Sequence, residues 1–313
     1  MANMSKIVLV GTGMVGATFA YRLVATGIAS ELVLIDVDRN RAEGEMMDLN
    51  HALPFERTCR ISVGDYSAAK DAGLVVITAG AAQKPGETRL DLVGRNVAIF
   101  RQIIPEIVKY APDCMFLIAS NPVDIMTYIV LKLSGFPRNR VIGSGTVLDT
   151  SRFRYMLGDY YKVDSRSVHA YILGEHGDSE VPVWSTANIA GVSLEDYSHL
   201  LDKPYSQQDM DNIFEEVRTA AYKIIERKKA TYYAIGSGLV RLVESILRDQ
   251  DTVYSVSSLL TGQYGIEDIC LSLPAVLGRD GVGRIIEIPL DEKEVEGLRR
   301  SATVLKDLAS KVL

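Results

Sequence analysis

Short runs of Val, Ile and Leu without polar alternation constrain this chain more than any other feature of its sequence. Six of them lie in the first half, at residues 6–10, 31–36, 60–64, 73–80, 115–122 and 140–145. Strands that are apolar on both faces are typical of parallel sheets with helices on each side. Helical patterns separate the runs, so the first half predicts an α/β fold with a doubly wound parallel sheet.

The pattern changes after about residue 145. We expect helices at 148–161, 206–229, 236–248 and 291–311, and a strand from 169 that runs into a polar loop. Several strands are expected between 252 and 288, with a hairpin turn at GRDG, residues 278–281. A length of 313 residues suits two domains. We therefore predict a nucleotide-binding domain at 1–145 and an α+β substrate domain at 146–313.

Composition excludes several classes of function. Acidic residues outnumber basic ones by 40 to 34, so the chain lacks the basic surface that a nucleic-acid-binding protein needs. No apolar run is long enough to predict a membrane span. Its three cysteines, Cys59, Cys114 and Cys270, have no zinc-ligand spacing and form no disulfide framework. We expect a protein of the reducing cytoplasm that binds no metal, no nucleic acid and no membrane.

A glycine-rich turn follows the first apolar run, where residues 11–16 read GTGMVG. In this G-x-G-x-x-G motif Gly11 would make the turn, Gly13 would let a pyrophosphate approach, and Gly16 would allow close helix–strand packing. Asp36 lies 20 residues beyond Gly16, at the end of the second run. A carboxylate there accepts hydrogen bonds from a ribose diol and repels a 2′-phosphate. Together these residues predict a Rossmann-type dinucleotide site that prefers NAD to NADP.

A histidine in a second glycine-rich loop, GEHGD at 174–178, is the candidate proton donor. Asp149 and Arg152 lie three residues apart at the start of a predicted helix, on one face. Asp149 could fix the tautomer of His176, and Arg152 could bind a substrate carboxylate through two hydrogen bonds. From the residues alone, a surface histidine with an unrelated, solvated Asp and Arg remains the alternative.

The stretch AGAAQKPGETR at 79–89 follows the fourth apolar run. That position is the edge at which open α/β sheets bind ligands. Its Gly, Pro and charged residues suggest a closing lid that brings Arg89 into a site. A solvated charged loop is the alternative.

Five motifs in order resemble the lactate/malate dehydrogenase family: GTGMVG, AGAAQKPGETRLDL, ASNPVD, GSGTVLDTSRFR and GEHGDSEVPVWS. The resemblance extends over nearly the whole chain, and within the family it is to the allosteric bacterial enzymes that act on lactate. It implies an NAD-dependent oxidoreductase that needs no metal. The implied reaction is reversible hydride transfer between NADH and pyruvate, giving (S)-lactate and NAD⁺.

The resemblance also implies residue roles. His176 would be the acid–base, paired with Asp149, and Arg89 would polarise the ketone. The substrate-binding residues would be Gln83, Arg89, Asn121, Arg152 and Thr231. The positions around the dinucleotide would be Gly11, Gly13, Val15, Gly16, Asp36, Arg41, Tyr66, Gly80, Ala81, Gln102, Asn121 and Ser144.

Substrate choice depends on Gln83, because the malate enzymes of the family carry an Arg at the matching position. A neutral Gln cannot compensate the second carboxylate of oxaloacetate, and an unpaired buried carboxylate is strongly disfavoured. This favours lactate, although the neighbouring Lys84 keeps malate as an alternative. A non-catalytic NAD-binding protein is the other alternative, against which the intact set of His176, Asp149, Arg152 and Arg89 argues.

Two further residues indicate regulation. Arg154 and His169 match positions that bind fructose 1,6-bisphosphate in allosteric bacterial members, so the resemblance implies activation by this bisphosphate. One Arg and one His supply too few cations for two phosphates. We therefore expect the site on a symmetry axis, where two subunits each contribute both residues. The resemblance implies a homotetramer.

Overall fold

The computed structural model describes residues 2–81, 89–202 and 204–312, without the side chain of Arg89. In that part of the chain the main layer is a nine-stranded sheet with the order β12–β11–β10–β6–β5–β4–β1–β2–β3. Its first six strands along the chain are β1 (Asn3–Val10), β2 (Glu31–Ile35), β3 (Arg60–Val63), β4 (Ala72–Ile77), β5 (Met115–Ile118) and β6 (Val141–Gly143). These six are parallel in the order 3-2-1-4-5-6, which confirms the doubly wound α/β fold.

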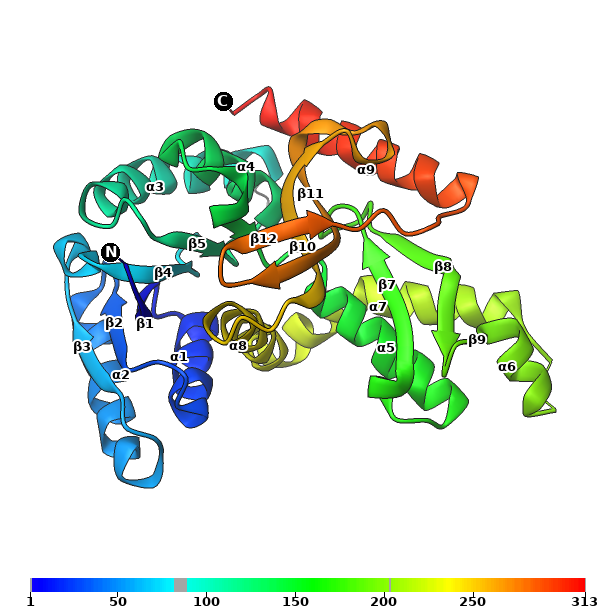
Figure 1. Ribbon diagram of the computed structural model, residues 1–313, viewed down its shortest axis with the longest axis horizontal. Coiled ribbons are helices and arrows are strands. Elements are labelled where there is room, and N and C mark those ends of the chain that lie inside the picture. Colours follow the sequence, from blue (N-terminus) through cyan, green and yellow to red (C-terminus); the bar gives the residue numbers. More distant parts are fainter. Residues whose placement is uncertain (1, 82–88, 203, 313) are drawn as a thin grey trace.

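Helices cover both faces of this sheet (Figure 1). One face carries α3 (Arg89–Tyr110), α4 (Val123–Ser134) and α9 (Glu292–Ala309), and the other carries α1 (Met14–Thr26), α2 (Arg39–Ala52) and α8 (Tyr233–Leu247). In β1, Val8 and Val10 pack with the first group, whereas Ile7 and Leu9 pack with the second. Alternate residues of one strand thus fill two cores, which explains why residues 7–10 are all apolar.

The second half of the chain extends the same sheet. The strands β10 (Thr252–Thr261), β11 (Glu267–Gly278) and β12 (Gly281–Ile285) continue it beyond β6 in antiparallel pairing. The predicted hairpin is confirmed, since Gly278 pairs with Gly281 across a two-residue turn. Because one sheet runs across residue 145, the proposed boundary there stays a prediction.

A smaller layer occupies the right-hand side of Figure 1. It consists of the sheet β7 (Val168–Leu173), β8 (Val181–Ile189) and β9 (Val192–Ser193) with α5 (Val147–Tyr161), α6 (Leu194–Leu200) and α7 (Gln207–Lys228). A separate apolar core joins these elements, where Phe153 of α5 meets Trp184 of β8 edge to face, with ring centroids 4.8 Å apart. No pattern in the sequence predicted β8, β9 or α6.

Three strands end earlier than the sequence predicted. β4, β5 and β6 stop at Ile77, Ile118 and Gly143, and the polar residues that follow leave the sheet at its carboxyl edge. This edge is where ligands bind in open α/β sheets.

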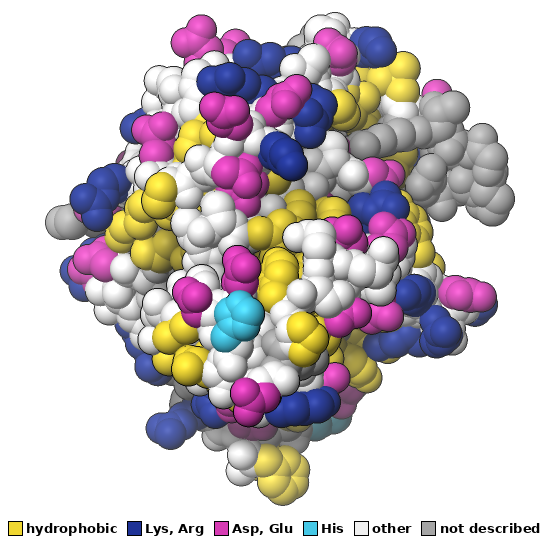
Figure 2. Space-filling view, turned by 90° about the vertical axis from the view of Figure 1, so that its right-hand side faces the viewer, with side chains coloured by type: hydrophobic (Ala, Val, Ile, Leu, Met, Phe, Trp, Pro, Cys, Tyr) yellow, Lys and Arg dark blue, Asp and Glu magenta, His cyan; other side chains and the backbone are white. Residues whose placement is uncertain are grey.

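The outer face at the α6 end of the molecule mixes basic and acidic side chains, without a large patch of one sign (Figure 2). Within the described ranges, no helix combines the length and apolarity that crossing a lipid bilayer requires.

Candidate active site

A cavity of about 780 Å³ lies at the carboxyl edge of β1, β2 and β4. The strand order reverses between β1 and β4, and open α/β sheets bind ligands at such a reversal. Most of the predicted dinucleotide positions line this cavity: Gly11, Gly13, Asp36, Arg41, Tyr66, Gly80, Ala81 and Gln102. Val15, Gly16, Asn121 and Ser144 are not part of its lining.

The three motif glycines have different reasons to lack a side chain. Gly11 has a φ of +98°, and a Cβ there would lie 2.5 Å from the backbone nitrogen of Ala79. A Cβ on Gly16 would lie 2.0 Å from the carbonyl oxygen of Gly11, so helix α1 can approach the turn only at a glycine. Gly13 has no atom within 4 Å of its Cβ position. The fold itself therefore leaves open space at Gly13, as a pyrophosphate needs.

Asp36 is held as a fixed carboxylate at the end of β2. Its Oδ2 accepts hydrogen bonds from the backbone N–H of Thr12 at 2.6 Å and from the Thr12 hydroxyl at 2.9 Å, while Oδ1 accepts from the N–H of Asp38 at 2.9 Å. Burial alone would raise the pKa of Asp36, but these hydrogen bonds and the charge of Arg41 outweigh burial and hold the pKa below its usual value. Carboxylate oxygens have further lone pairs, so this group can still accept bonds from a ribose.

The structure brings His176, Asp149 and Arg152 together, as the sequence predicted. Asp149 lies in the first turn of α5 and is 2% exposed. Its Oδ2 lies 2.5 Å from Nδ1 of His176, and its Oδ1 accepts a hydrogen bond from Nη1 of Arg152 at 2.8 Å. One buried carboxylate therefore orients both cations and leaves Nε2 of His176 for a substrate.

The proton of this pair is held strongly. Burial would lower the pKa of His176, but the charge of Asp149 and its hydrogen bond outweigh burial and raise the pKa to about 9. Burial would raise the pKa of Asp149, and the charges of His176 and Arg152 hold it below its usual value instead. His176 is therefore an imidazolium at neutral pH, ready to donate a proton.

Backbone contacts place the histidine loop. Gly174, with a φ of +90°, pairs with Ser272 of β11 through hydrogen bonds of 3.0 and 3.1 Å. Oδ2 of Asp124 in α4 accepts the backbone N–H of His176 at 2.8 Å, and Asp124 is 1% exposed. This role of Asp124 was not predicted from the sequence. An Asp in the otherwise apolar start of α4 was the available signal.

Asn96 is a second residue that sequence reasoning missed. It is 1% exposed, and its Oδ1 accepts the N–H of Ala81 at 2.7 Å while its Nδ2 donates to the carbonyl oxygen of Asn121 at 2.8 Å. The amide thus joins the two loops that follow β4 and β5. No pattern in the sequence pointed to it.

The other predicted residues are placed as follows. Ser144 is buried after β6, and its backbone N–H donates to the carbonyl oxygen of Ile118 at 2.8 Å. Val15 packs with the core beneath α1. Thr231 is half-buried between α7 and α8. Gln83 and the side chain of Arg89 lie outside the described residues. Their roles stay predictions.

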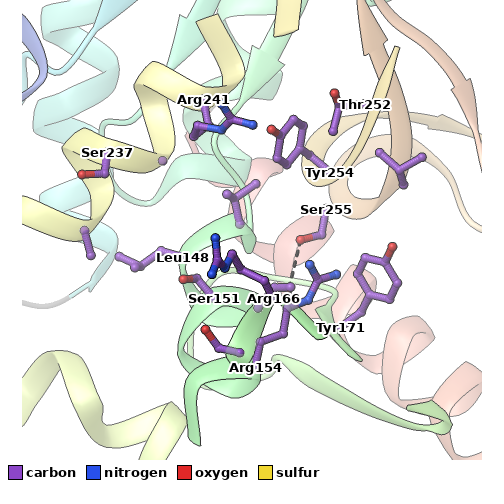
Figure 3. Close-up of a pocket in the computed structure, with 16 residues that line it drawn as sticks. Leu148, Ser151, Arg154, Arg166, Tyr171, Ser237, Arg241, Thr252, Tyr254 and Ser255 are labelled. Atoms are coloured by element: carbon purple, nitrogen blue, oxygen red, sulfur yellow. Dashed lines mark hydrogen bonds between the residues drawn. The ribbon is translucent and has the colours of Figure 1, made fainter. Parts of the chain in front are cut away.

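A second cavity, of about 650 Å³, lies between α5, α8 and β10 (Figure 3). Arg154, Arg166 and Arg241 line it. Arg154 donates from Nε to the carbonyl oxygen of Ala170 at 2.9 Å, and its guanidinium lies 5.1 Å from the ring centre of Tyr171. Arg166 and Arg241 are paired with Asp164 and Glu244. The exposed His169 of β7 does not belong to the lining.

The described residues contain no group of three or more His, Cys, Asp or Glu side chains that could hold a metal ion. All three cysteines are free and buried.

Comparison with known proteins identifies relatives of both halves. Residues 5–143 match the NAD-binding domain of lactate/malate dehydrogenases, and residues 146–313 match the alpha/beta C-terminal domain of the same enzymes. The chain is 52% identical over 303 residues to an L-lactate dehydrogenase of Acetivibrio thermocellus, covering 97% of this chain and 96% of the relative. It is 53% identical over 312 residues to L-lactate dehydrogenase 2 of Bacillus cereus, covering 99% of each.

Solved structures agree with these relatives. The minor L-lactate dehydrogenase of Enterococcus mundtii, in a ligand-bound form, has a TM-score of 0.96 and 44% identity, with 99% of each chain covered. A lactate dehydrogenase from a deep-sea metagenome library of the Medee basin also has a TM-score of 0.96, with 48% identity, and covers 100% of this chain and 99% of that one.

Proposed function

The chain belongs to the lactate/malate dehydrogenase family and is an NAD-dependent oxidoreductase, and from this premise we propose that it interconverts pyruvate and (S)-lactate. The observation that carries the proposal is the buried ion pair of His176 and Asp149 with Arg152 on the same carboxylate. This arrangement provides a proton donor beside a cation that suits a 2-oxo acid.

The cavity at the carboxyl edge of β1, β2 and β4 suits NAD. The open space at Gly13 fits a pyrophosphate, and the fixed carboxylate of Asp36 fits a ribose diol. Bound NADH supplies the hydride for the carbonyl carbon of pyruvate.

The side chains of this protein manage charge and proton during that transfer. Arg152 binds the substrate carboxylate, for which a guanidinium offers two parallel hydrogen bonds. As negative charge develops on the ketone oxygen, His176 donates the proton of Nε2 to it, and Asp149 stabilises the imidazole through Nδ1. In the reverse direction, neutral His176 accepts the hydroxyl proton of lactate. By resemblance, Arg89 polarises the ketone, while Asn121 and Thr231 contact the substrate.

Lactate rather than malate is the proposed substrate. Gln83 is neutral where the malate enzymes carry an Arg, and all the relatives named above are lactate dehydrogenases. Malate remains the second candidate because Lys84 lies next to Gln83.

The test is NADH oxidation with pyruvate and with oxaloacetate, followed by absorbance. We expect pyruvate to be the better substrate. The His176→Asn variant should lose about 10²- to 10⁴-fold in turnover while NADH binding persists. Wild-type turnover in that variant would remove His176 as the acid, and a preference for oxaloacetate would favour malate instead.

We further propose that fructose 1,6-bisphosphate activates a homotetramer of this chain in the reducing cytoplasm, to which its free cysteines are suited. Arg154 supports the effector site because it lines a cavity together with two further guanidinium groups. Repeated cations attract an anionic bisphosphate and repel one another without it, so binding would favour the assembled, active state. Arg152 lies two positions before Arg154 in α5, which links effector and substrate sites directly.

Pyruvate saturation curves with and without fructose 1,6-bisphosphate test this proposal. We expect a lower KM with the bisphosphate, an effect that weakens with salt. The double variant Arg154→Gln with His169→Ala should lose the response. A wild type that does not respond, or a double variant that responds fully, would refute it.

A further inference from the structure

The segment that leads from β7 to His176 is bonded to a different element at every second residue. Ile172 contacts α5, Gly174 pairs with β11, and the backbone N–H of His176 donates to α4. The second and third of these contacts hold the histidine loop itself. The first contact has another consequence, because α5 is the helix that carries Asp149.

The backbone groups of Ile172 need partners outside their own sheet. β7 is an edge strand of the three-stranded sheet, and Ile172 lies opposite Pro182 of β8, which has no N–H to donate. At such a position of an antiparallel pair, the N–H and the carbonyl oxygen point away from the neighbouring strand. Ile172 is 0% exposed, so water cannot satisfy these two groups.

Two threonines at the start of α5 supply the partners. The hydroxyl oxygen of Thr150 accepts the N–H of Ile172 at 3.0 Å, and the hydroxyl of Thr146 donates to the carbonyl oxygen of Ile172 at 2.6 Å. The proton of the Thr150 hydroxyl has two acceptors within reach, the same carbonyl oxygen at 3.2 Å and the hydroxyl of Ser255 in β10 at 3.0 Å (Figure 3). Thr150 therefore joins α5 both to β7 and to the nine-stranded sheet.

Neither hydroxyl is used in the way that is common at a helix start. Thr146 is the N-cap of α5, where a threonine side chain usually accepts an N–H of the first turn, but its side chain makes no such bond. Both threonines are buried, at 0% and 6% exposure. They lie four residues apart on one face of the helix, with Asp149 between them in the sequence. Their hydroxyls hold this face against β7.

We propose that Thr150 is a positioning residue for the proposed reaction, with Thr146 in support. Its hydroxyl fixes α5 against β7 and so sets the distance between Asp149 and His176, whose side chains meet at 2.5 Å. Asp149 directly precedes Thr150, and His176 follows Ile172 by four residues, so only a short length of chain separates the hydroxyl bonds from the pair. The inference rests on the proposed reaction, in which this pair delivers the proton.

Thr150→Val keeps the shape of the side chain and removes the hydroxyl, which leaves a buried N–H of β7 without its acceptor. As the contact with Asp149 lengthens, the midpoint of the His176 titration, followed by NMR of the imidazole, should fall by about half a pH unit or more. The carboxylates that act on this imidazole, which are Asp149, Asp124 and the buried Glu180 before β8, all remain in the variant. The shift therefore reports a change in distance and not a loss of charge.

Kinetics give a second measure of the same displacement. In Thr150→Val, kcat/KM for pyruvate should fall by about 10-fold, because a misplacement of about 1 Å can cost up to about 100-fold in rate, whereas the dissociation constant of NADH should not change. Thr150→Ser restores the hydroxyl and should return kcat/KM and the His176 midpoint to nearly the wild-type values.

Thr127→Val is the matched control. Thr127 is buried in α4, and its hydroxyl donates at 2.7 Å to the carbonyl oxygen of Val123 in the same helix. This substitution also removes a buried hydroxyl but breaks no bond between elements. It should leave the His176 midpoint and kcat/KM unchanged.

A Thr150→Val protein that is less stable but keeps the wild-type midpoint and kcat/KM would overturn the proposal, since the hydroxyl would then serve stability alone. If that variant does not fold, Thr146→Val decides, because it removes one hydroxyl bond to β7 and leaves those of Thr150. It should lower the His176 midpoint by a smaller amount, and an unchanged midpoint would contradict the proposal. A protein that shows these shifts but does not reduce pyruvate would refute the proposed function and leave the positioning role intact.

Discussion

The contact between Asp149 and His176 should control the pH range of the enzyme, and Asp149→Asn tests this directly. The substitution removes the charge of Asp149 and keeps its size. The carboxylate is 2% exposed and lies 2.5 Å from Nδ1 of His176, so solvent does little to screen the interaction. The side chain of His176 is 25% exposed, so the ring keeps some access to solvent on the side away from Asp149 and can be titrated.

The magnitude follows from the pKa of His176. The difference between about 9 and the ordinary value of 6.5 corresponds to about 3 kcal/mol in favour of the protonated form. Without the charge of Asp149, burial is opposed mainly by weaker, more distant carboxylates, and the pKa should fall towards 6.5 or below. At about pH 7.5 the protonated fraction should then drop from nearly all molecules to about a tenth.

The assay is kcat/KM for pyruvate reduction between about pH 5.5 and 10. We expect a loss of about 10-fold at about pH 7.5, and an alkaline midpoint that is lower by about 2.5 pH units. Asp159→Asn, an exposed position on the same helix, is the control and should leave the midpoint in place. If Asp149→Asn keeps the wild-type midpoint, the buried carboxylate does not hold the proton and the reasoning fails.

Three further predictions concern coenzyme, substrate and stability. Because Asp36 carries a fixed negative charge, kcat/KM should be much higher with NADH than with NADPH, and equal values would show that Asp36 does not meet the ribose. Gln83→Arg should shift preference from pyruvate towards oxaloacetate, and an unchanged ratio would show that Gln83 does not face the substrate. Folding raises the pKa of Glu180 to about 8 from an ordinary 4.5, so its contribution to stability is complete below about pH 4.5 and is lost as pH rises towards 8. Urea unfolding at these pH values should show less of that loss in Glu180→Gln than in the wild type.

The parts of the molecule that local patterns determine could be predicted from the sequence. Residues 7–10 of β1 are all apolar because both faces of the strand are buried there, and this pattern indicates a covered parallel sheet. The dinucleotide motif is local as well. Its three glycines, Gly11, Gly13 and Gly16, form one turn after β1, and Asp36 lies at the end of the neighbouring strand β2. The meeting of His176, Asp149 and Arg152 was also anticipated.

The parts that depend on distant pairing could not be predicted. The sequence pattern of residues 252–285 does not indicate that their strands pair with β6 rather than form a separate sheet. Glu180 reads as an ordinary polar residue of a loop, because the neighbours beside it in the fold come from α7 and α9, which are distant in the sequence. Asn96 likewise acquires its role only when the loops after β4 and β5 lie on either side of it.

The antiparallel extension of the sheet has a consequence for engineering. The loop that carries His176 is bonded through Gly174 to Ser272 of β11, and β11 belongs to the same sheet as the strands beneath the coenzyme cavity. Chimeras that exchange coenzyme specificity by joining two homologues at residue 145 would cut this sheet between β6 and β10. In such a chimera β6 and β10 would come from different parents. The distance from the coenzyme cavity to His176 would then depend on how well these two strands pair. A chimera that transfers residues 252–285 together with the first half would keep the nine-stranded sheet within one parent. The histidine loop would then join that sheet through the backbone hydrogen bonds of Gly174 and Ser272, so this chimera should tolerate the exchange better than one joined at residue 145.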